Sequence, residues 1–118
     1  MSVAWNETTP IYRQLRDRIV AMILDGELKE GDAVPSVRQV AVDYQINPLT
    51  VSKAYQDLAD EALLDKRRGL GLFVGSGARE KLLELERERF LKEEWPTLRA
   101  RLTRLGFDLN TLLAETRQ

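Results

Sequence analysis

The fold is decided by residues 35–41, Pro-Ser-Val-Arg-Gln-Val-Ala, residues 46–55, Ile-Asn-Pro-Leu-Thr-Val-Ser-Lys-Ala-Tyr, and residues 67–74, Arg-Arg-Gly-Leu-Gly-Leu-Phe-Val. The first two stretches each open a short helix, and the third is a basic hairpin that turns at glycine. In this order they predict a winged helix-turn-helix, an arrangement that holds one helix in the major groove of DNA.

Both short helices carry start signals. Ser36 offers a capping hydroxyl, and Gln39 three residues later completes the pattern of a capping box. Asn47 caps the next helix, with Pro48 at its first position. The apolar positions of this second helix recur at helical spacing and mark its buried face: Val51, Ala54, Tyr55 and Leu58.

A longer amphipathic helix precedes this pair. It is expected to be capped by Thr9, to begin at Pro10 and to stop at Gly26. Its predicted buried face consists of Ile11, Leu15, Ile19, Met22 and Ile23. The hairpin is expected to run out from Leu63-Leu64 and return through Leu72-Phe73-Val74.

The chain is expected to have two parts, a winged helix-turn-helix domain in residues 1–75 and a helical dimerisation region in residues 76–118. Gly75-Ser76-Gly77 would be a hinge between them, followed by a long charged helix, a kink at Pro96 and a stop at Gly106. The fold class is therefore mainly α with a small β-wing. A stripe at spacings of four and three residues predicts a seam between two helices: Leu91, Trp95, Leu98, Leu102 and Leu105. The alternative is that the stripe covers the chain's own head or its last helix, through Leu109, Leu112 and Leu113; we favour the seam between two subunits, because so short a helical region has little core of its own.

The composition excludes several classes of function. Hydrophobic residues make up 43% and charged residues 31%, as in a folded globular protein. Neither a membrane-spanning run nor a signal peptide is visible, so we expect a cytoplasmic protein. Cysteine and histidine are absent from the sequence, which removes disulfides, the usual zinc sites and the commonest general base. We therefore expect no metal, no cofactor and no enzymatic activity.

The charge balance makes the local arrangement of the Lys and Arg residues important. Residues 1–76 carry 9 Lys and Arg against 11 Asp and Glu, a net charge of −2. Proteins that bind nucleic acid are usually basic, although the neutralisation of phosphates is a local effect. DNA binding thus requires that the Lys and Arg residues gather on one face and the Asp and Glu residues on another. A winged-helix module that binds another protein and no DNA is the competing hypothesis.

Residues 10–74 resemble the DNA-binding domain of the GntR family of bacterial transcription regulators. The resemblance is carried by four motifs in the family's order: Pro10-Ile11-Tyr12, Gly26-Glu27-Leu28-Lys29-Glu30-Gly31, Pro35-Ser36-Val37-Arg38 and Arg67-Arg68-Gly69-Leu70-Gly71-Leu72-Phe73-Val74. The short second region and the Asn-Pro-x-Thr-Val-x-Lys-Ala-Tyr helix are similar to the YtrA subfamily. This resemblance implies a small homodimeric repressor that binds a palindromic operator. Any small-molecule effector would bind at the dimer interface or between the two regions.

The candidate DNA contacts lie at the starts of the two short helices and at the wing: Ser36, Arg38, Asn47, Leu49, Thr50, Ser52, Lys53, Arg67, Arg68 and Gly69. Several have a structural alternative. Leu49 would meet a thymine methyl or pack between helices, and Arg38 would contact DNA or pair with Asp32. Lys53 would reach phosphate or guanine, or remain in solvent. Arg67 and Arg68 would both reach the minor groove, or one of the two would be structural instead.

Two further expectations concern aromatic and unusual residues. Tyr12, Tyr44, Tyr55 and Phe73 are expected to belong to the core, and Trp5 to pack against a partner subunit. Ala62 stands where the family usually has a glycine, just before the first strand of the wing.

Overall fold

The computed structural model describes residues 5–115. The contacts of the chain divide it into two compact units, Met1–Leu83 and Glu84–Gln118, which we call the head and the tail. Within the described residues, no helix combines the length and the apolar character needed to cross a membrane. Each unit is described by itself.

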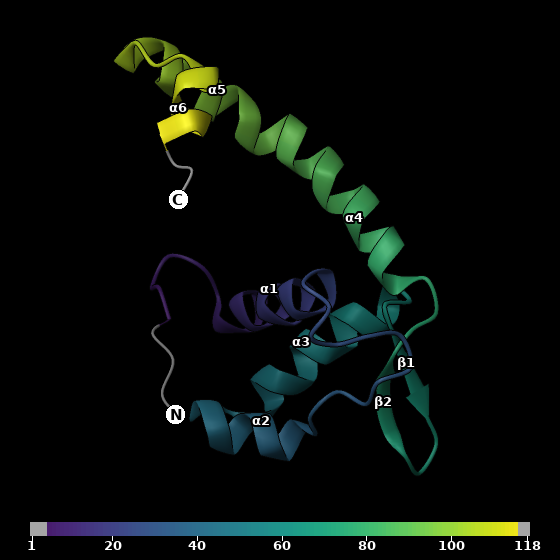
Figure 1. The fold of residues 1–118 in the computed structure, drawn as a ribbon. Coiled ribbons are helices and arrows are strands. Elements are labelled where there is room, and N and C mark those ends of the chain that lie inside the picture. Colours follow the sequence, from purple (N-terminus) through teal and green to yellow (C-terminus); the bar gives the residue numbers. More distant parts are fainter. Residues whose placement is uncertain (1–4, 116–118) are drawn as a thin grey trace. The chain divides into compact units, whose positions relative to one another are not determined.

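The described part of the head contains three complete helices, the start of a fourth and a two-stranded wing (Figure 1). The helices are α1 (Ile11–Leu24), α2 (Val37–Tyr44) and α3 (Pro48–Asp60), and the strands are β1 (Leu64–Arg67) and β2 (Gly71–Val74). The two strands are antiparallel, with Leu64 opposite Val74 and Arg67 opposite Gly71. The prediction of a mainly helical fold with a small β-wing is confirmed.

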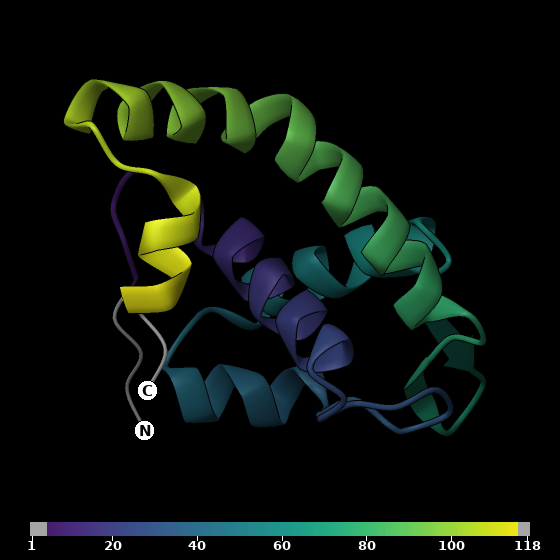
Figure 2. The same cartoon turned by 45° about the horizontal axis from the view of Figure 1, so that its top comes forward.

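The core of the head forms where α1 crosses α3 (Figure 2). The predicted buried face of α3 is confirmed, because Val51, Ala54, Tyr55 and Leu58 are all buried. On α1 the predicted face is only partly right. Ile11, in the first turn, is exposed and Met22 is half-buried. The core is completed from α1 and from the segments around the wing: Leu15, Ile19, Val20, Ile23, Leu28, Val34, Leu63, Leu64 and Val74.

One predicted cap is not observed, and one predicted capping box is only half formed. Thr9 does not cap α1, because the helix begins one residue later than expected and the position before it is Pro10, which makes no side-chain cap. Ser36 caps α2 as predicted, accepting a hydrogen bond of 3.0 Å from the backbone N–H of Gln39. The reciprocal half of the capping box is missing, because the Gln39 amide donates to Asp43 one turn further along.

The expected glycine hinge is packed into the head. Gly75 is buried and donates its N–H to the Leu63 carbonyl at 2.9 Å. A Cβ at this position would lie 3.0 Å from the Ala62 carbonyl oxygen, so the close approach of the backbone requires glycine. Gly77 donates its N–H to Glu30 at 2.6 Å, and the following Ala78 is buried.

Helix α4 (Ala78–Arg89) begins in the head and continues into the tail. The tail then contains a π-helical segment η1 (Phe90–Glu94), α5 (Trp95–Leu105) and α6 (Leu109–Glu115). Gly106 ends α5 in a left-handed conformation, as predicted. The break expected at Pro96 is displaced into η1, where Trp95 N–H bonds to the carbonyl of Phe90, five residues back. Proline lacks an N–H and its ring crowds the carbonyl four residues earlier, which explains why the turn before it widens.

Candidate nucleic-acid interface

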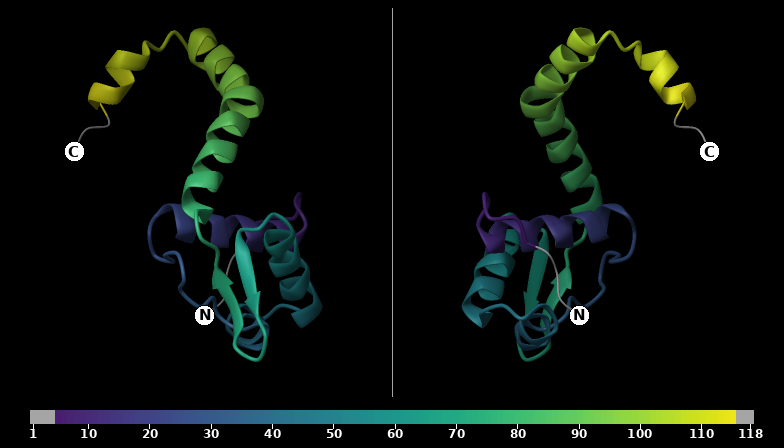
Figure 3. Two further views of the ribbon diagram at one scale, coloured as in Figure 1. Left: turned by 90° about the vertical axis from the view of Figure 1, so that its right-hand side faces the viewer. Right: turned by 90° about the vertical axis from the view of Figure 1, so that its left-hand side faces the viewer.

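Helix α2 and the tip of the wing lie at the same end of the head, in the view of Figure 1 and in both views of Figure 3. The segment that leads into α2 is tied to α3, because the Tyr55 hydroxyl donates to the carbonyl of Pro35 at 2.6 Å. Burial of this phenol raises the pKa of Tyr55, so it remains a neutral donor. Ser36, which follows Pro35, is used as the helix cap.

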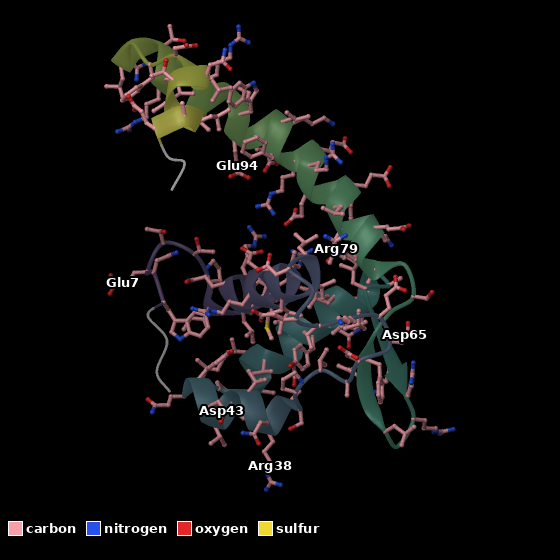
Figure 4. All side chains as sticks on the ribbon, in the orientation of Figure 1. Glu7, Arg38, Asp43, Asp65, Arg79 and Glu94 are labelled. Carbon is pink, nitrogen blue, oxygen red and sulfur yellow. The ribbon has the colours of Figure 1, made fainter. Side chains whose placement is uncertain are left out.

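Arg38 extends from α2 away from the body of the head (Figure 4). The ion pair with Asp32 that the sequence left open is not formed, since Asp32 accepts the backbone N–H of Lys29 at 2.8 Å instead. Among the described residues, Arg38 makes no salt bridge. Its guanidinium therefore remains available for a phosphate or a guanine edge.

The start of α3 presents both polar and apolar groups. Asn47 caps the helix by accepting the backbone N–H of Leu49 at 2.8 Å, and its side chain is exposed. Leu49 is 77% exposed, so within the head it does not pack between helices. Ser52 is also exposed and Thr50 is half-buried. Leu49 and Ser52 thus lie on the face of α3 that points away from the core, whereas Thr50 lies at the edge of the core face.

Lys53, one turn further along α3, contacts an aromatic ring. Its ammonium nitrogen lies 4.6 Å from the centroid of the Tyr12 ring on α1. This is the distance of a cation–π contact. Tyr12 is half-buried and packs against the core, so its assignment to the core is only part of its role.

The two arginines of the wing have different surroundings. Arg67 lies with its guanidinium carbon 4.2 Å from the centroid of the Phe73 ring, on the opposite strand. Arg68 is exposed and forms no salt bridge or cation–π contact among the described residues. Gly69 has φ +77 at the tip, a conformation that favours glycine, and the Leu70 N–H closes the turn onto Arg67 at 2.9 Å. Of the two arginines, Arg67 is the one with a contact inside the wing, although its side chain is exposed as well.

Several acids of the head are engaged near the start of α4. Glu61 accepts the Arg16 guanidinium at 2.7 Å, and the Glu61 carbonyl accepts the Lys81 ammonium at 2.7 Å. Glu30 is bound to the Gly77 N–H, as described above. Figure 4 shows Arg79, near the start of α4, far from Arg38 across the head. Glu30 lines a hollow together with Arg79 and so lies on that side of the head, whereas Asp43 shares α2 with Arg38.

Sequence reasoning missed three features of this end of the head. Leu70 at the wing tip and Val42 on α2 are largely exposed apolar residues. An open hollow of about 540 Å³ lies beside Arg38, with almost wholly apolar walls formed by Val37, Ala41, Val42, Ile46 and Pro48. The helical wheel of α2 would have placed Val42 outside the core.

Trp5 packs within the head. Its ring meets the ring of Tyr44 edge-on, with 6.1 Å between the two centroids, and the Arg18 guanidinium lies 5.5 Å from the Trp5 ring.

The head matches a known family along most of its length. The family described as "Bacterial regulatory proteins, gntR family" matches residues 11–74. The chain is 40% identical over 77 residues to the HTH-type transcriptional repressor YtrA of Bacillus subtilis (strain 168), a match that covers 65% of this chain and 59% of that protein. The chain therefore spans less than two thirds of this relative.

Solved structures extend the likeness into the tail. YtrA from Sulfolobus acidocaldarius, a GntR-family transcription factor, superposes with a TM-score of 0.59 at 31% identity, over 87% of this chain and 96% of that one. The DNA-binding domain of AraR in complex with operator ORR3 superposes with a TM-score of 0.56 at 25% identity, over 62% of this chain and 88% of that one. These matches confirm the predicted winged helix-turn-helix and the resemblance to YtrA. The chain belongs to the gntR family of bacterial regulatory proteins.

Proposed function

We propose that this protein is a transcription repressor that binds a two-fold symmetric DNA operator as a homodimer. The observation that carries the proposal is that α2 and the wing tip lie at one end of the head, where Arg38 and Arg68 form no salt bridge with any described residue. The AraR domain, whose fold the head shares, was solved with its operator. In this proposal the protein acts in the cytoplasm by binding DNA and catalyses no reaction.

Each candidate residue receives a role in this proposal. Arg38 and Arg68 contact the DNA backbone or the groove edges, and Lys53 contacts a phosphate. The exposed Leu49 side chain contacts a thymine methyl in the major groove. The remaining contacts come from polar groups around the helix starts and from the tip of the wing: Ser36, Asn47, Thr50, Ser52, Arg67 and Gly69.

The tail supplies the dimer in this proposal. Leu91, Leu98 and Leu105 are 60%, 43% and 57% exposed, and no residue of the described part of the tail is buried. Trp95 and Leu102 are half-buried, with the Trp95 ring 6.4 Å from that of Phe90. A helical segment of this size has too little core of its own to be stable alone. Two such tails packed along this stripe would bury it and would fix two heads on one operator. A small-molecule effector would act by changing the spacing of the heads.

Selection of bound sequences from random duplex DNA tests the proposal. We expect the selected duplexes to share an inverted repeat, with half-sites separated by about one helical turn or a multiple of it. Affinity should fall steeply as the salt concentration rises, because phosphate contacts release counterions. A protein-interaction module would select no common sequence and would show no such salt dependence.

A further inference from the structure

The environment of Lys53 offers its ammonium group two different partners. Asp57 follows four residues later on α3, and a lysine and an aspartate at this spacing are neighbours on a helix surface. The Tyr12 ring lies on the other side, on α1, and the ammonium nitrogen is 4.6 Å from its centroid. In the described residues the cation takes the ring, and no salt bridge joins Lys53 to Asp57.

The choice between these partners decides the charge that the surface offers. A carboxylate neutralises a lysine that pairs with it, whereas an aromatic ring attracts the cation through its quadrupole and leaves the full charge in place. The positions around Lys53 make this difference important. Asp57 and Asp60 follow on the same helix, and Asp60 is already bound by the Gln56 amide at 2.7 Å. A lysine released from Tyr12 would therefore turn toward an acidic stretch of α3.

Tyr12 is well placed to hold the cation. It is the second residue of α1, it is half-buried, and it packs against the core of the head. Its hydroxyl makes no hydrogen bond to another described residue. The ring is thus fixed by packing, and its face is the part of the side chain that has a partner.

We propose that Tyr12 is a positioning residue of the DNA interface: its ring holds the Lys53 ammonium away from Asp57 and so keeps a full positive charge available for a backbone phosphate. The inference rests on the proposed contact between Lys53 and DNA. It assigns part of the binding apparatus to α1, a helix that carries none of the residues predicted to contact DNA.

The test measures the dissociation constant as a function of salt, on the tightest duplex recovered from random DNA. Tyr12→Leu should weaken binding several-fold and reduce the salt slope by about one unit per head, the effect of losing one phosphate contact. Tyr12→Phe keeps the ring and should bind as the parent does. Lys53→Ala should reproduce the effect of Tyr12→Leu, and the double variant should be no weaker than Lys53→Ala. Adding Asp57→Asn to Tyr12→Leu should restore part of the slope.

A second measurement needs no variant. The ε-methylene protons of Lys53 should show an upfield ring-current shift in the NMR spectrum of the parent protein. A random-coil shift for these protons would overturn the proposal, as would an unchanged salt slope in Tyr12→Leu or an equal loss in Tyr12→Phe, which would assign the effect to the hydroxyl. Arg38→Ala separates these outcomes from a wrong interface. If it too leaves the slope unchanged, the proposed DNA face itself is wrong.

Discussion

The head and the tail differ in what their apolar residues do. In the described chain every buried hydrophobic residue lies in the head, from Leu15 on α1 to Leu82 on α4. The described tail, residues 84–115, contains no buried residue, although it is rich in leucine. The head thus has a core of its own, whereas the apolar side chains of the described tail are exposed or half-buried. Folding and assembly are therefore expected to be separable properties of this chain, and substitutions in one unit should leave the other property unchanged.

The largest effect is expected in the tail. Leu98→Glu would bury a charge without a partner in the proposed seam, which should weaken self-association by several kcal/mol. Sedimentation should then show a monomer whose head remains folded and binds DNA weakly. Arg99→Glu changes the charge of the neighbouring exposed residue off the stripe and serves as the control. A dimer of Leu98→Glu as stable as the parent would place the interface elsewhere.

The wing provides the reverse experiment. Arg68→Ala should lower the salt slope of DNA binding by about one unit per head, because its guanidinium is free to contact phosphate. Self-association should not change. Arg67→Ala is the matched comparison: this arginine lies on the Phe73 ring, so its loss should reduce the slope less. Equal slopes for Arg68→Ala and the parent would remove the wing tip from the interface.

Stability of the head alone should respond to Tyr55. Tyr55→Phe removes the hydrogen bond to the Pro35 carbonyl and should lower the free energy of unfolding by about 1 kcal/mol. Because burial raises the pKa of Tyr55, the folded head holds this proton at a pH where the unfolded chain releases it. The contribution of Tyr55 to stability should therefore be constant below about pH 10 and fall above it.

Urea unfolding of the two proteins across this range provides the measurement. In Tyr55→Phe the alkaline loss should be smaller than in the parent, while association through the tail is unchanged. The same alkaline loss in both proteins would show that other groups cause it.

The smallest expected effect is an increase in stability. Ala62 has φ +62, a left-handed conformation that is strained for residues with a Cβ. Ala62→Gly should raise the free energy of unfolding by about 0.5–1 kcal/mol. Ala59→Gly, three residues earlier within α3, should lower it by a similar amount. Thermal unfolding of the two variants decides this point, and a loss of stability in both would mean that the strain at Ala62 is negligible.

The sequence predicted features that depend on local pattern better than features that depend on contacts between distant residues. Asn47, Pro48 and the apolar period of α3 determine that helix locally, and all three expectations are confirmed. The four motifs of the family likewise predicted the winged helix-turn-helix. Local signals failed where two partners compete for one side chain. Gln39 has both the Ser36 backbone and Asp43 within reach, and the spacing that defines a capping box does not distinguish them.

The candidate site shows the same limit. The exposure of Leu49 and the freedom of Arg38 depend on which side chains pack nearby, and the sequence left both open. The contacts of Lys53 with Tyr12 and of Arg67 with Phe73 join residues of different elements. In the tail, periodicity identified the apolar stripe, but a stripe alone does not state what covers it. Hydroxyl-radical footprinting of the complex with DNA would therefore show which individual residues contact DNA.

The central claim is that two heads, held together by their tails, bind one operator. Native mass spectrometry of the full chain with the selected duplex tests it most directly. The account predicts two chains for each duplex, and one chain for each duplex with Leu98→Glu, bound more weakly. Two chains for each duplex with both proteins, or a single chain with the parent, would contradict it.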